Sequence, residues 1–134
     1  MEEATLRTAT EVVRSRWPGA QVLYLFGSEA RGGASSESDV DLAVVAPCSL
    51  AAYDRFVLQE DLARSLGRDV DLVDLRVASE ALKMEVVRDG RVLFEASAAV
   101  RGAFECEALA DYINHRERFA ANYADIAERG VAYG

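Results

Sequence analysis

The sequence is poor in the residues that build thiol and imidazole chemistry. It has two cysteines, Cys48 and Cys106, and one histidine, His115. The cysteines have no CxxC spacing and no neighbouring histidine cluster, so neither a zinc site nor a disulfide framework is indicated. Free thiols suit a reducing compartment. A single histidine argues against a His-based hydrolase, and its polar surroundings at 114–118 lead us to expect that His115 faces solvent or a partner.

Long apolar runs and an excess of positive charge are also absent. No apolar run approaches the roughly 20 residues of a membrane span. The acidic stretch Met1–Glu3 lacks the basic and apolar regions of a signal peptide. The formal net charge of -8 disfavours direct binding of nucleic acid, whose phosphates it would repel. We therefore expect a cytoplasmic protein with no membrane span and no direct nucleic-acid contact.

Helical and strand patterns alternate along the 134 residues, which are enough for one domain. Their periodicities and turn residues predict helices at 5–17, 50–66 and 79–88, and strands at 21–26, 40–46, 69–75 and 92–94. A Gly- and Ser-rich loop with one helical turn is expected at 27–38. The second of these helices is indicated by apolar positions near Tyr53, Phe56, Val57 and Leu62 and ends at Gly67.

The last third of the chain is helical in pattern. From residue 98 to 126 there is no proline and one glycine, and apolar residues recur close to every 3.6 positions. These residues are Phe104, Leu109, Tyr112, Ile113, Phe119, Tyr123 and Ile126. We expect one long helix or two short ones, mainly packed on the core, with any overhanging part a candidate partner surface. The whole is a single α/β (α+β) domain, 1–134, with a small mixed sheet, flanking helices, a core at about 5–96 and a C-terminal helical segment at about 97–134.

Asp39-Val40-Asp41 is the first candidate for chemistry. On a strand, residues i and i+2 point to the same face, with Cα atoms roughly 6–7 Å apart. Two carboxylates placed in this way repel each other unless cations lie between them, and two Mg2+ ions about 3.5–4 Å apart are the usual solution in phosphoryl transfer. By itself the pair is equally compatible with solvated aspartates at the start of a strand.

Gly27-Ser28 lies at the end of the preceding strand, twelve residues before Asp39. A glycine there lets backbone N–H groups approach an anion, and the Ser28 hydroxyl is able to donate to a phosphate oxygen. Ser28 would serve equally as a helix cap without a ligand. Arg31, one turn onward, either reaches a triphosphate or remains a surface arginine.

A third carboxylate is expected on the strand at 69–75. Asp69 and Asp71 share one face and Asp74 lies on the other. Asp71 is flanked by Val70 and Leu72, and a carboxylate inside a strand core needs a partner or a metal. Asp69 stands nearer the start of the strand. Asp71 is therefore the first choice for the third carboxylate and Asp69 the alternative.

The motifs resemble those of a known family. Gly27-Ser28-Glu29-Ala30-Arg31-Gly32, five further residues and Ser38-Asp39-Val40-Asp41-Leu42 match every fixed position of the GSxARG…SDxDL signature of the minimal nucleotidyltransferases, in the DNA polymerase β-like superfamily. The resemblance continues through 70–73 and 89–94 and covers roughly residues 5–96. The C-terminal helix is similar to that of the MntA-type antitoxin branch, whose members pair with HEPN-domain (HepT-like) toxins.

This resemblance implies the nucleotidyltransferase fold and a set of roles. Asp39 and Asp41 would hold two Mg2+ ions, and Asp71 would complete the metal site and act as general base. The nucleotide-binding residues would be Gly27, Ser28, Arg31 and Ser38, with ATP as substrate. An acceptor hydroxyl would attack the α-phosphorus in line, and pyrophosphate would leave. In the MntA-type branch the acceptor is a toxin tyrosine, whose AMPylation silences the toxin's RNase activity within a hetero-oligomer.

The length of the chain gives an indication of which kind of molecule accepts the transferred nucleotide. About 38 residues follow the core and leave little room for an acceptor domain, which favours an acceptor supplied by a protein partner. Two alternatives remain: a small-molecule transferase of the aminoglycoside type, and a non-catalytic antitoxin that acts by complex formation. The intact Ser28, Asp39, Asp41 and Asp71 argue against the latter, because a pure binder has no need of converging carboxylates.

Overall fold

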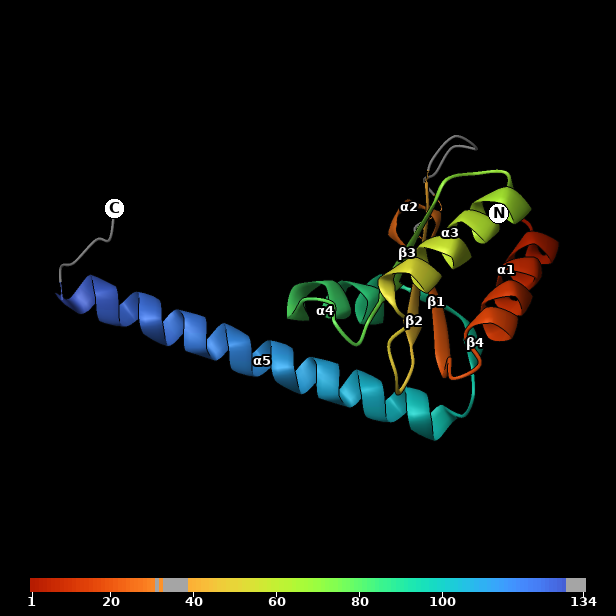
Figure 1. The fold of residues 1–134 in the computed structure, drawn as a ribbon. Helices are drawn as coiled ribbons and strands as arrows, with labels where there is room; N and C mark the ends of the chain where they lie inside the picture. Colours follow the sequence, from red (N-terminus) through yellow and green to blue (C-terminus); the bar gives the residue numbers. More distant parts are fainter. Residues whose placement is uncertain (31, 33–38, 130–134) are drawn as a thin grey trace.

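The computed structural model describes residues 1–30, 32 and 39–129, with side chains up to residue 118 in the last helix. Figure 1 shows a small sheet with helices on both faces and one long helix that extends away from it. The elements in chain order are α1 (Glu3–Arg16), β1 (Val22–Phe26), α2 (Gly27–Ala30), β2 (Val40–Val45), α3 (Ala52–Leu66), β3 (Val70–Asp74), α4 (Glu80–Asp89), β4 (Arg91–Glu95) and α5 (Ala98–Arg129). Each element predicted from the sequence is present, with ends shifted by a few residues.

The four strands form a mixed sheet in the order β3-β2-β1-β4. β1 runs antiparallel to both β2 and β4, whereas β2 and β3 are parallel. β1 is buried along its whole length because helices cover both faces of the sheet, which explains its uninterrupted apolar sequence. This arrangement confirms the expected α/β architecture with a small mixed sheet.

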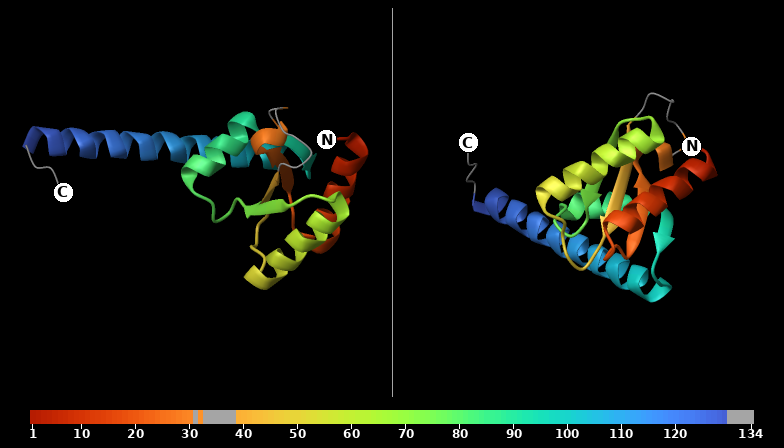
Figure 2. Two further views of the ribbon diagram at one scale, coloured as in Figure 1. Left: turned by 90° about the horizontal axis from the view of Figure 1, so that it is seen from above. Right: turned by 45° about the vertical axis from the view of Figure 1, so that its right-hand side comes forward.

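Helices α1 and α3 cover one face of the sheet, and α4 and α5 cover the other (Figure 2). The first face packs Leu6 and Val13 of α1 with Leu58 and Leu62 of α3. The second face places Tyr24 of β1 against apolar residues of α4 and α5. Successive β1 residues contribute to opposite cores because strand side chains alternate between faces.

The apolar positions of α3 do not all share one face. Tyr53 is 74% exposed and Phe56 is 58% exposed, while Leu58 and Leu62 are buried. The two sets lie on opposite sides of a helix with 3.6 residues per turn, so packing on α1 and the sheet buries only one of them. α3 ends as predicted at Gly67, whose φ of 67° gives the left-handed C-cap that glycine tolerates.

α5 is one continuous helix of 32 residues, on the order of 48 Å long. Its first half packs against α4, and its second half projects beyond the domain (Figures 1 and 2). Phe104 faces the core, where its ring lies 6.4 Å from that of Tyr24. Leu109 and Ile113 remain 45% exposed. In the part of the chain that the structure describes, no helix is long and apolar enough to cross a membrane.

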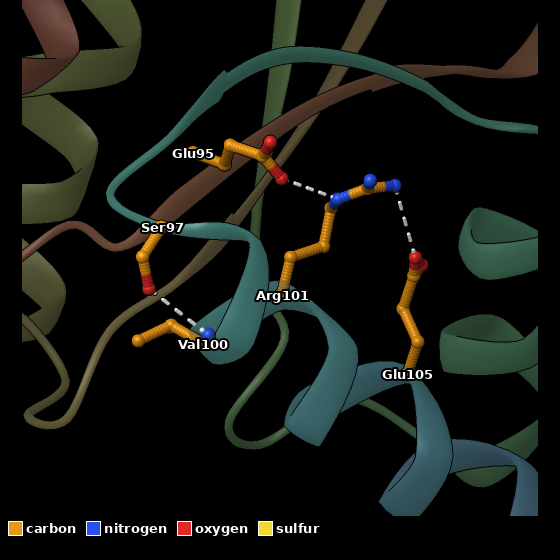
Figure 3. A network of polar contacts seen from close by, with 5 residues as sticks. All are labelled: Glu95, Ser97, Val100, Arg101 and Glu105. Atoms are coloured by element: carbon orange, nitrogen blue, oxygen red, sulfur yellow. Dashed lines mark hydrogen bonds and ion pairs between the residues drawn. The ribbon is translucent and has the colours of Figure 1, made fainter.

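A polar network anchors the start of α5 (Figure 3). The Arg101 guanidinium pairs with Glu95 at the end of β4 and with Glu105 one turn further along α5. The Ser97 hydroxyl accepts a hydrogen bond from the Val100 N–H at 3.1 Å and so caps the helix. These contacts bind α5 to the end of β4 and set the direction in which the helix leaves the sheet.

Candidate active site

Neighbouring strands place two of the predicted carboxylates side by side. Asp41 of β2 and Asp71 of β3 are direct partners in the parallel register, on strands about 4.8 Å apart. Asp39 immediately precedes β2 and is exposed, as is Asp71, while Asp41 is half-buried. The sheet therefore gathers three carboxylates at one end, where β2 and β3 begin.

Gly27 brings the end of β1 to the same place. Phe26 is the antiparallel partner of Asp41, and Gly27 follows it as the first residue of α2. Gly27 has a φ of 71°, and a Cβ at this position would overlap with Oδ2 of Asp41. Both the backbone conformation and the close approach of the carboxylate thus require glycine. Ser28, the second residue of α2, is half-buried beside it.

The surroundings of the β3 carboxylates differ from the sequence-based expectation. The sequence predicts that Asp71 needs a partner inside a strand core, but its side chain is exposed, because it lies on the face of β3 opposite to Val70 and Leu72, which pack in the core. The buried carboxylate of β3 is Asp74, whose Oδ1 accepts a hydrogen bond from the Arg76 N–H at 2.9 Å. Asp69 is exposed, and its carbonyl accepts from the Val40 N–H at 2.8 Å, which ties the start of β2 to β3.

Two supporting contacts were not visible in the sequence. The Glu29 carboxylate on α2 pairs with Arg68, just before β3, and both side chains are largely buried. The terminal ammonium of Met1 lies 3.6 Å from the same carboxylate. Glu29 occupies the variable position of the signature motif, so no local pattern marked it. The pair connects the turn that carries Gly27 and Ser28 to the base of the Asp71 strand.

The free edge of β3 is held by α3. Gln59 Oε1 accepts a hydrogen bond from the Leu72 N–H at 2.9 Å, and Arg55 Nη1 lies 3.5 Å from the Leu72 carbonyl oxygen. Because Leu72 follows Asp71 directly, these side chains fix the backbone beside the exposed carboxylate. No pattern in the sequence marked either residue as a support for this strand.

Two predicted site residues, Arg31 and Ser38, lie outside the described residues. Across residues 1–30, 32 and 39–118, no three His, Cys, Asp or Glu side chains converge closely enough to hold a metal ion. The backbone thus brings Asp39, Asp41 and Asp71 to one end of the sheet, while their side chains do not form a closed cage. His115, expected to face solvent or a partner, is 60% exposed, with Nδ1 3.0 Å from Glu80 Oε2.

Comparison with known families decides the class of this site. The family model described as polymerase beta, nucleotidyltransferase matches residues 10–99, which include both motifs and β3. The chain belongs to the polymerase β nucleotidyltransferase family. The match begins within α1 and ends at the first residues of α5.

Individual relatives give a more specific comparison than the family model. Over 94 residues the chain is 39% identical to the protein adenylyltransferase MntA of Shewanella oneidensis, an alignment that covers 70% of this chain and 68% of that protein. A toxin–antitoxin crystal structure with AMP-PNP matches with a TM-score of 0.83 and 32% identity, over 95% of this chain and 99% of the other. A tri-AMPylated Shewanella oneidensis HEPN toxin in complex with its MNT antitoxin matches with a TM-score of 0.80 and 31% identity, over the same shares. These similarities confirm the nucleotidyltransferase fold.

Proposed function

We propose that this chain transfers AMP from ATP to a tyrosine hydroxyl of a cognate HEPN toxin and thereby neutralises the toxin. The proposal is carried by the pairing of Asp41 with Asp71 beside Gly27 in a chain of this family. The similarity to a protein adenylyltransferase and to the antitoxin of a tri-AMPylated HEPN toxin supports a HEPN toxin as the acceptor of AMP. The toxin–antitoxin structure with AMP-PNP supports an adenine nucleotide as the donor.

Asp39, Asp41 and Asp71 would hold the Mg2+ ions of this reaction. Carboxylate oxygens are the ligands that Mg2+ prefers, and the register places two of the three carboxylates on adjacent strands. Because the exposed side chains of Asp39 and Asp71 are free of core packing, we expect them to turn toward a cation when it binds. Bound Mg2+ stabilises negative charge on the attacking and leaving oxygens of an in-line displacement.

The remaining roles follow from the position of each residue. Gly27 lets the backbone approach the triphosphate, and the Ser28 hydroxyl donates to a phosphate oxygen. Arg31 and Ser38 are proposed as further nucleotide contacts on the basis of the signature motif. Asp71 accepts the proton of the acceptor hydroxyl, whose oxygen bonds to the α-phosphorus as the bond to pyrophosphate breaks.

A protein acceptor is supported by the relatives of this chain. A relative with 39% identity is a protein adenylyltransferase. A solved structure with 31% identity contains a tri-AMPylated HEPN toxin in complex with an MNT antitoxin. A folded partner that presents its own tyrosine needs only a docking surface, whereas a small acceptor needs a pocket around it. These relatives therefore favour AMP transfer to a protein over the small-molecule alternative.

Transfer of a radiolabel tests the proposal. The chain is incubated with ATP labelled at the α-phosphate, Mg2+ and a candidate HEPN toxin. We expect label on the toxin and loss of its RNase activity, both abolished by Asp39→Ala together with Asp41→Ala. Neutralisation without label, retained in the double variant, would establish binding alone. Label on an added aminoglycoside instead of the toxin would establish the small-molecule activity.

A further inference from the structure

One side of α5, which we call the outer face, is exposed and uncharged over three turns. It consists of Gly102, Cys106, Leu109, Ala110 and Ile113, all of which are exposed. The spacing of these residues places them on one side of a helix. In a chain of which 28% is charged, an exposed helical face without a charged side chain is unusual. Leu109 and Ile113 lie one turn apart toward its C-terminal end, each 45% exposed.

The rest of α5 holds this face away from the domain. The opposite side of the helix carries Phe104 and Ala108, which pack on the core, and His115, which contacts Glu80 at the start of α4. Arg101 joins the helix to Glu95 of β4 (Figure 3). With these contacts in place, the helix cannot rotate to bury Leu109 or Ile113 within its own domain.

The comparisons indicate what covers the outer face. The nucleotidyltransferase family model ends at residue 99, and α5 begins at Ala98, so the core of this enzyme family is complete without α5. The toxin–antitoxin structure nevertheless matches 95% of this chain with a TM-score of 0.83. A match of that extent includes a helix corresponding to α5. The helix is therefore shared with a chain that has a toxin partner, although the family domain does not require it.

We propose that the outer face of α5 is the surface on which the HEPN toxin docks, an inference that rests on the proposed function. The occupant is an apolar surface of the toxin. Gly102, Cys106 and Ala110 let a partner surface approach the helix backbone closely, and Leu109 and Ile113 provide the side chains that the partner buries. A second copy of this chain is a less suitable occupant, because two chains that each carry a charge of -8 repel one another.

The outer face and the proposed active site lie at opposite ends of β1, so toxin binding and AMP transfer use different parts of the domain. α5 follows Glu95, which pairs with Val22 at the start of β1, whereas Gly27 and Asp41 lie at the opposite end of that strand. A toxin held on the outer face must reach across the domain to present a tyrosine to the nucleotide. Changes on the outer face should therefore weaken toxin binding and leave ATP binding and the chemical step unaltered.

The test is a double substitution, Leu109→Glu with Ile113→Glu. A matched control is Phe56→Glu on α3, which also adds a charge to an exposed apolar position of a helix. We measure the KM for the toxin in AMP transfer, the Kd of the complex by calorimetry and the Kd for ATP. Because a charge placed on a surface that becomes desolvated in a complex is costly, we expect the KM and the Kd for the toxin to rise by more than about tenfold. The kcat at saturating toxin, the Kd for ATP and all values of the control should stay unchanged.

A second variant, Ala110→Trp, adds bulk without charge and should weaken toxin binding in the same direction. Circular dichroism establishes that each variant is folded. Normal toxin affinity in folded variants of both kinds would overturn the docking surface and leave the proposed function intact. Absence of label on the toxin with the unmodified chain would instead overturn the proposed function together with the docking surface. A dimer of the isolated chain that dissociates in the double variant would assign the face to a second copy.

Discussion

At the scale of single residues, Gly27 is the position where backbone and site are most closely coupled. Among the described glycines with positive φ, it is the one at which a side chain would also meet a functional carboxylate. Gly67 has nearly the same φ but has open space where a Cβ would lie. A comparison of substitutions at the two glycines therefore distinguishes the effect of backbone strain from the effect of displacing Asp41.

Gly27→Ala and Gly67→Ala form a matched pair. Each places a Cβ on a left-handed backbone and should cost about 1–2 kcal/mol in the free energy of unfolding, measured with urea. Gly27→Ala must in addition displace the Asp41 carboxylate, so we expect its rate of AMP transfer to fall on the order of 100-fold. Gly67→Ala should retain its rate. Equal transfer rates in the two variants would show that the contact with Asp41 is unimportant.

Asp71→Asn and Asp69→Asn test the choice of third carboxylate. Asp71 stands opposite Asp41 in the register, whereas Asp69 precedes β3 and ties the strands through its backbone carbonyl. We expect Asp71→Asn to lose transfer by more than about 100-fold and to keep the melting temperature of the unmodified chain, because an exposed carboxylate contributes little to folding. Asp69→Asn should remain active. The reverse pattern would transfer the role to Asp69.

Tyr24→Phe tests a buried hydroxyl. Tyr24 is 1% exposed, and no hydrogen-bond partner for its Oη is found among the described residues. Burial, reinforced by the nearby Glu105 carboxylate, raises the pKa of the Tyr24 phenol. The unfolded chain therefore ionises this group near pH 10 while the folded chain does not, so stability is lost as the pH rises above about 10.

Removing the hydroxyl of Tyr24 should remove this loss of folding stability at alkaline pH. We expect Tyr24→Phe to be at least as stable as the unmodified chain at pH 7, because no hydrogen bond is broken. Its free energy of unfolding should decrease less between pH 9 and pH 11, as followed by urea titrations. A loss of about 1 kcal/mol or more at pH 7 would show that the hydroxyl has a hydrogen-bond partner in solution.

At the scale of elements, β3 is an edge strand that carries part of the proposed site. It ends the sheet, carries Asp71 and is supported by α3 through Gln59 and Arg55. An unpaired strand edge tends to fray or to pair with another chain. The contact from Gln59 replaces a missing strand neighbour at the backbone N–H next to Asp71.

Gln59→Ala should therefore loosen β3. We expect a loss of about 1 kcal/mol in the free energy of unfolding and faster hydrogen exchange of the Leu72 amide. Gln59→Glu keeps an acceptor oxygen at the same place and serves as the control. Unchanged exchange at Leu72 in Gln59→Ala would show that the hydrogen bond does not protect the edge.

At the scale of the whole molecule, negative charge gathers where the proposed cations bind. The chain carries a formal charge of -8, and the sheet brings three of its carboxylates to one end. A cation that binds only the folded chain stabilises it by about 1.4 kcal/mol at ten times its Kd. Mg2+ should therefore raise the melting temperature by a few degrees, and EDTA should reverse the rise.

The double variant Asp39→Ala, Asp41→Ala is the control for this measurement. It should melt at the same temperature with and without Mg2+, because it lacks two of the three carboxylates of the proposed cation site. Sodium chloride at matched ionic strength should leave the unmodified chain unchanged, because screening of charge is not specific binding. An equal rise in the double variant would place the cation elsewhere.

The sequence by itself determined the helices and strands and indicated the family to which the site belongs. Strand alternation, turn residues and the spacing of Gly27-Ser28 from Asp39-Val40-Asp41 are local patterns, and local backbone preferences are sufficient to interpret them. The family model and the toxin–antitoxin structures confirm the class of enzyme that these motifs indicate. The roles of individual site residues stay predictions, which the substitutions above test.

Only the tertiary structure decided which side chains are buried and which surface is left free. Asp71 is exposed and Asp74 is buried because the two lie on opposite faces of β3. The face of Asp74 packs in the core formed with α1 and α3, and which face a helix covers is decided by the tertiary packing. The pairing of Glu29 with Arg68 joins segments 39 positions apart, which no periodicity reports. The apolar stripe of α5 divides in the same way: α4 and the sheet bury Phe104, whereas the uncharged face around Leu109 and Ile113 stays exposed because no element of the described chain packs against it.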